Sequence, residues 1–94
     1  MQSSDKQPLR VVIQHLPGPS LYVLIVYDGR TGTAFVPLQY GSLQDVLKAL
    51  RAAGISLRQQ DLAIKDAPEP YIVFTGNFAL DAAQLSLLGL KRQA

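Results

Sequence analysis

Hydrophobic and polar side chains alternate along residues 9–16 with the two-residue period of a β-strand. Residues 21–27 follow as an uninterrupted apolar run, which is typical of a strand in the middle of a sheet with both faces covered. Pro17-Gly-Pro-Ser20 lies between the two segments and predicts a hairpin loop. In that hairpin Leu16 faces Leu21, and the pairing continues as far as Arg10 with Tyr27.

A third strand is predicted over residues 33–40, after a turn at residues 28–32. Pro37 lies inside this segment and has no backbone N–H to donate, so the strand belongs at an edge of the sheet or beside a bulge. The first three strands therefore form an antiparallel meander.

Two short helices are indicated by their capping residues. Ser42 with Asp45 has the spacing of a capping box, and Gly54 supplies the left-handed residue that ends the helix. Asp81 with Gln84 repeats the spacing, and Gly89 ends the second helix. The first helix carries an apolar stripe made of Leu43, Val46, Leu47 and Leu50.

The segment between these helices is compatible with more than one structure. Ser56 with Gln59 again has cap spacing and predicts one more helical turn, so residues 57–66 are open to helix or strand. Residues 62–64 and 71–74 are predicted to pair as strands. The expected fold is α+β: a three-stranded antiparallel meander, one or two further strands, and two short helices packed mainly on one face of the sheet.

Length and composition limit this fold to one domain. The chain has 94 residues, of which 48% are hydrophobic and 17% are charged, and it has no cysteine. We expect residues 1–8 to form a disordered arm and residues 9–94 to form the single domain. The lack of cysteine excludes disulfide scaffolds, Cys-ligated zinc and thiol chemistry.

The net charge of +2 predicts no particular partner, because the basic residues are scattered along the chain. No stretch approaches the roughly 18 apolar residues that a membrane span needs. The first eight residues are polar and no apolar region follows in the window of a signal peptide. We therefore expect a cytoplasmic location and no membrane partner.

The sequence predicts no catalytic, cofactor-binding or metal-binding residue. His15 is the only histidine, and a half-buried, hydrogen-bonded role is expected for it. Asp61, Asp66 and Glu69 form an acidic cluster, but they lack the spacing and the glycine of a calcium loop. A small enzyme that uses His15 and Tyr22 as acid–base groups is the weakest of three functional hypotheses.

Nucleic-acid binding is the second hypothesis. Residues 46–62 imitate a helix-turn-helix, and Gly29-Arg-Thr-Gly32 matches the G-x-x-G loop of KH domains, although strands flank it here. The basic residues that would contact nucleic acid are Arg30, Lys48, Arg51 and Arg58.

Protein interaction or self-association is the first hypothesis. Two short helices cover only one face of the sheet, so the other face is expected to show an apolar patch of the kind that commonly contacts proteins. The edge strand that contains Pro37 offers a second contact surface. The residues predicted for the interface with a protein partner or a second copy are Val11, Ile13, Tyr22, Leu24, Val26 and Phe35.

Overall fold

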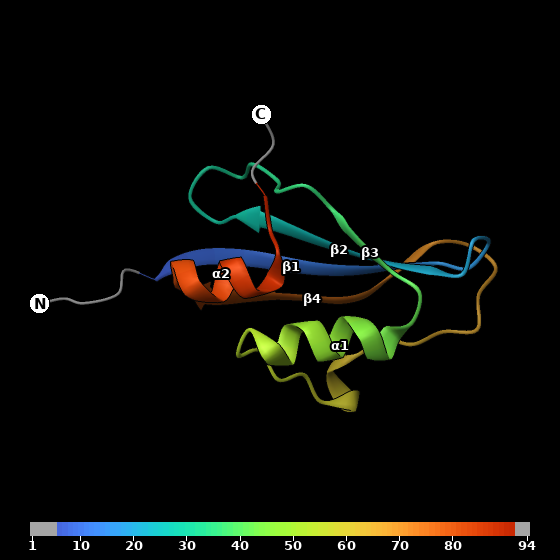
Figure 1. Cartoon of the computed structure of the whole chain (residues 1–94). Helices are drawn as coiled ribbons and strands as arrows, with labels where there is room; N and C mark the ends of the chain where they lie inside the picture. Colours follow the sequence, from blue (N-terminus) through green and yellow to red (C-terminus); the bar gives the residue numbers. More distant parts are fainter. Residues whose placement is uncertain (1–5, 92–94) are drawn as a thin grey trace, which may run out of the picture.

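The computed structural model describes residues 6–91 and confirms the α+β class. Within this range the chain forms an antiparallel sheet with strand order β3-β2-β1-β4, two α-helices and one short 3₁₀ helix (Figure 1). The strands are β1 (Gln7–Leu16), β2 (Leu21–Asp28), β3 (Leu38–Tyr40) and β4 (Tyr71–Leu80). The helices are α1 (Leu43–Ala52), η1 (Gln59–Asp61) and α2 (Ala82–Leu88).

The β1–β2 hairpin has the predicted register. Leu16 pairs with Leu21, and the ladder continues to Arg10 with Tyr27 and Leu9 with Asp28. Ser20, the last residue of the loop, has a φ of 59°, so the hairpin closes on a left-handed residue that is not glycine. The apolar sequence of β2 thus lies in the interior of the sheet, between β3 and β1.

The third strand is shorter than predicted, although its position at an edge is confirmed. Ala34 forms an isolated bridge with Tyr27, and β3 resumes the pairing with β2 only at Leu38. Between these points Pro37 has no N–H for the ladder, and the N–H of Val36 donates instead to the carbonyl oxygen of Lys91 at 2.8 Å. The tail after α2 is therefore fastened to this edge.

Two boundaries differ from the prediction. Strand β1 begins at Gln7, so residues 7 and 8 of the predicted arm are part of the sheet, and residues 1–5 of that arm lie outside the described residues. Residues 62–64 form no strand; a single backbone hydrogen bond joins Ala63 N to Val73 O at 2.7 Å. The strand predicted at residues 71–74 is longer than expected. As β4 it extends to Leu80, and it pairs with β1 along its whole length.

Both α-helices begin and end as their capping residues predict. The Ser42 hydroxyl accepts from Asp45 N, and Gly54, at a φ of +92°, follows the end of α1. Asp81 and Gln84 form a reciprocal capping box at α2, which ends at left-handed Gly89. The third helical turn is η1, where Arg58 N donates to the Asp61 carboxylate and Asp61 N donates to Arg58 O, both at 2.9 Å. This pair lies two residues later than the predicted pair, Ser56 and Gln59.

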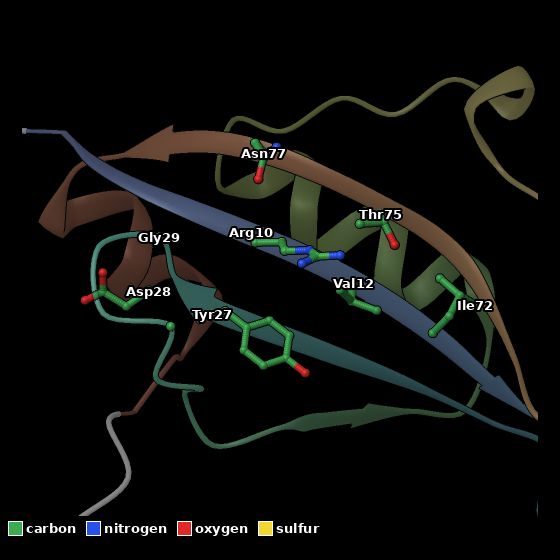
Figure 2. Close-up of a pocket in the computed structure, with 9 residues that line it drawn as sticks. Arg10, Val12, Tyr27, Asp28, Gly29, Ile72, Thr75 and Asn77 are labelled. Atoms are coloured by element: carbon green, nitrogen blue, oxygen red, sulfur yellow. The ribbon is translucent and has the colours of Figure 1, made fainter.

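Both helices pack on the same face of the sheet (Figures 1 and 2). Val46 and Leu50 of α1 and Leu88 of α2 are buried in one cluster with side chains of β1, β2 and β4. The capping residue Gln84 joins the helices, because its Nε2 donates to Ala53 O at 3.1 Å. The sheet has one face under helices and one face without them, and we call the second the open face.

Candidate binding surface on the open face of the sheet

The residues predicted for the protein interface lie on the covered face, and this corrects the prediction. Five of them are at most 5% exposed, because the two helices pack directly against them. The sixth, Tyr22, is partly buried against the same core. Both faces of β2 are apolar, so the alternation along the strand did not show which face the helices cover. The five buried residues are Val11, Ile13, Leu24, Val26 and Phe35.

Strand alternation places a second set of side chains on the open face. Those of β1, β2 and β4 form rows across the sheet, because directly paired residues point to the same side. Tyr27, Arg10 and Asn77 form one row. The open face carries the side chains of Arg10, Val12, Gln14, Val23, Ile25, Tyr27, Ile72, Thr75 and Asn77.

The neighbouring rows are more apolar. Ile25, Val12 and Thr75 form the second row, and Gln14 lies between Val23 and Ile72 in the third. Because each polar residue stands beside aliphatic ones, the open face is a mosaic of small apolar areas and hydrogen-bonding groups. Figure 2 shows Val12, Ile72 and Thr75 in front of the strands, with α1 behind them.

A shallow hollow of about 620 Å³ lies over this surface. Figure 2 shows the Arg10 side chain extended along β1 toward Val12 in the middle of the hollow. Val12 is only 8% exposed although no helix covers it, because long neighbouring side chains shelter it. At the rim, by contrast, Ile72 is 46% exposed. The hollow therefore has an aliphatic floor, an exposed apolar rim and a central cation.

Asp28 lies at one end of the hollow, and it pairs with Leu9, whose side chain is on the covered side of the sheet. Its carboxylate accepts from Gln7 Nε2 at 2.7 Å and from the N–H of Arg30 at 2.8 Å, and the residue is 5% exposed. The N–H of Gly29 also donates to Pro8 O at 2.9 Å, and a Cβ at Gly29 would lie 2.9 Å from that oxygen. These contacts fix the loop after β2 against the start of β1.

Arg10 is the one charged side chain that the strands place on the open face in the described range. It forms no ion pair with any residue that the structure describes. The strands bring no carboxylate to this face. A ligand that covers the hollow therefore meets the Arg10 cation, while the Asp28 carboxylate at the end of the hollow is held by Gln7 and the N–H of Arg30.

The residues predicted for nucleic-acid binding are exposed, but they do not form the predicted motif. Residues 46–62 contain the end of α1 and the single turn η1, so no second α-helix follows that would enter a groove. Arg30 lies in the loop after β2, and Lys48 and Arg51 lie on α1. Arg58 forms an ion pair with Asp61, with 3.5 Å between Arg58 Nε and Asp61 Oδ2.

His15 lies in an aromatic cluster on the covered side. Its ring stacks on Tyr22 with a centroid distance of 4.3 Å, and it meets the edge of Tyr71 at 5.5 Å. A hydrogen bond was predicted for the His15 ring, but its Nδ1 is buried and has no hydrogen-bond partner among the described residues. The hollow of the open face is lined by neither His15 nor Tyr22, so these two rings lie outside it.

Residues 6–91 contain no helix that is long and apolar enough to span a bilayer. Within the same range, no three histidine or carboxylate side chains gather closely enough to ligate one metal ion.

Comparison of the chain with models of protein families, with curated proteins and with solved structures found no match. The candidate surface therefore rests on its own geometry and chemistry.

Proposed function

We propose that this chain is a small non-enzymatic interaction module that binds a protein partner through the open face of its sheet. The observation that supports the proposal is the position of Val12, Ile25 and Ile72 on a sheet face without helices. Exposed aliphatic side chains that stand among hydrogen-bonding groups, with an arginine between them, are typical of protein contacts.

The chemistry of the surface favours a partner different from this chain. If two copies docked face to face, two Arg10 guanidinium groups would be buried, and the carboxylate that lines the hollow, that of Asp28, already accepts hydrogen bonds from Gln7 and from the N–H of Arg30. Burying an unpaired charge is strongly unfavourable. We therefore expect a partner that places an Asp or Glu side chain over Arg10 and apolar side chains over Val12 and Ile72.

Photo-crosslinking in the native host tests the proposal. A photoactivatable side chain is introduced at Ile72, and the matched control has it at Leu87, which is 63% exposed on α2 and lies off the open face. We expect a defined adduct with another protein at position 72 and none at position 87. Arg10→Glu should reduce the yield by about tenfold, because it replaces an attraction by a repulsion.

Three results would contradict the proposal. They are the absence of an adduct at position 72, the same adduct at position 87, or an adduct whose mass equals two copies of the 10.2 kDa chain.

A further inference from the structure

The second surface of interest is the outer edge of β4, a ten-residue strand at the end of the sheet. The beginning of this edge is covered, because Ala63 N donates to Val73 O at 2.7 Å. Farther along, Thr75, Asn77 and Ala79 are exposed. The structure shows no hydrogen bond from their backbone groups to any residue of the described range beyond the β1–β4 ladder.

The register shows which backbone groups point outward. Phe35 N donates to Val26 O, so the N–H and C=O groups of Val26 point toward β3 and away from β1. Val26 and its β1 partner Val11 are therefore a pair without hydrogen bonds between them. Val11 therefore bonds to its partner on the other side, Gly76. Because paired groups alternate along an antiparallel ladder, Thr75, Asn77 and Ala79 direct their N–H and C=O groups away from the sheet.

The edge of β4 lacks the usual protection against pairing. Natural edge strands are kept apart by charged side chains, proline, bulges or shortness. From Tyr71 to Leu80 there is no charged residue and no proline, and the irregularity in the β1–β4 register lies near Ile13, before the unpaired stretch. The opposite edge strand, β3, has three residues and follows Pro37.

We propose that β4 pairs in antiparallel fashion with β4 of a second copy, about a two-fold axis at Asn77. Asn77 then faces Asn77 of the second copy, and Thr75 faces its Ala79. This register pairs all three outward-facing residues of each chain, whereas an axis at Gly76 or Phe78 leaves one of them unpaired. The proposal does not depend on a partner binding to the open face.

The side chains along this edge suit a second copy of the same chain. No charges face each other across the axis, because β4 has none. The two Asn77 amides both donate and accept, so a symmetric pair satisfies them. The axis runs perpendicular to the sheet, so the two open faces join on one side.

Disulfide trapping tests the register. The chain has no cysteine, so each variant carries only the thiols introduced. In Asn77→Cys the Cα atoms of the hydrogen-bonded pair would lie about 5.5 Å apart, within the range that a disulfide bridges. Thr75→Cys is the matched control, because Thr75 faces Ala79 and not itself. Under a mild oxidant, Asn77→Cys should give about tenfold more covalent dimer than Thr75→Cys.

Sedimentation equilibrium of the full chain tests the dimer without a crosslink. The wild type should dimerise with rising concentration, and Asn77→Pro should remain a monomer, since proline removes an N–H that the sheet itself does not use. Gln39→Pro, at an exposed position on β3, is the control that should still dimerise. A monomeric wild type, or equal crosslinking of the two cysteine variants, would overturn the proposal, whether or not Asn77→Pro folds.

Discussion

Tyr71 holds the segment before β4 through both hydrogen-bonding functions of its hydroxyl. The hydroxyl donates to Lys65 O at 2.8 Å and accepts from Lys65 N at 3.0 Å. The Lys65 ammonium also lies 5.8 Å from the centre of the same ring. Together with the bond from Ala63 to Val73, these contacts replace the strand that was predicted at residues 62–64.

We expect Tyr71→Phe to lower the free energy of unfolding by about 1–2 kcal/mol, because two hydrogen bonds to one backbone residue are lost while the ring remains. Urea unfolding measures the change. Tyr27→Phe is the control: the Tyr27 hydroxyl forms no hydrogen bond with any residue of the described range, so the change should stay below about 0.5 kcal/mol. Equal losses in the two variants would contradict this role of Tyr71.

Asp28 is expected to be important for the end of the β1–β2 hairpin. Asp28→Ala leaves the amide of Gln7 and the N–H of Arg30 without their acceptor, and we expect a loss of about 2–3 kcal/mol in stability. The exposed Asp66 provides a control, because Asp66→Ala should change stability by less than about 0.5 kcal/mol. Thermal unfolding of both variants checks the difference, and similar melting temperatures would disprove it.

The two glycines that follow the α-helices should respond differently to alanine. Gly89 has a φ of 77° with nothing near its missing Cβ, so Gly89→Ala should cost about 1 kcal/mol from backbone strain alone. At Gly54 a Cβ would lie 2.7 Å from Gln84 Nε2. Gly54→Ala should therefore cost more, because Gln84 would also lose its bond to Ala53. Chemical unfolding compares the two; a smaller loss for Gly54→Ala is the contrary result.

Neighbouring residues of β2 should differ in their effect on stability. Leu24 is fully buried under the helices, so Leu24→Ala should cost about 2–5 kcal/mol. Ile25 is only partly buried on the open face, and Ile25→Ala should cost less than half as much. If Ile25→Ala were the more destabilising in a monomeric sample, the assignment of the two faces would be wrong.

Stability should fall at high pH through Tyr40. Burial raises the pKa of the Tyr40 hydroxyl above its ordinary value of 10.0. Above pH 10 the unfolded chain ionises first, so the stability that Tyr40 contributes is present below pH 10 and is lost as the pH rises through the raised pKa. Tyr40→Phe should flatten this part of the stability–pH curve, and an unchanged slope would exclude Tyr40 as its source.

The elements whose signals are local can be predicted from the amino-acid sequence alone. The register of the β1–β2 hairpin follows from loop length and alternation, and the limits of α1 and α2 follow from the capping residues Ser42, Asp81 and Gly89. These features depend on residues a few positions apart. They form in the structure as they were predicted.

Which face of the sheet stays open depends on the three-dimensional packing of the helices and cannot be predicted from local patterns. Because β2 is apolar on both sides, its sequence was equally consistent with helices above Leu24 or above Ile25. The choice depends on how α1 and α2 cross the sheet, which involves contacts between distant residues. The same holds for the length of β4 and its unpaired edge: the pairing of Phe78 with Leu9 joins residues that are remote in sequence, and no local pattern predicts it.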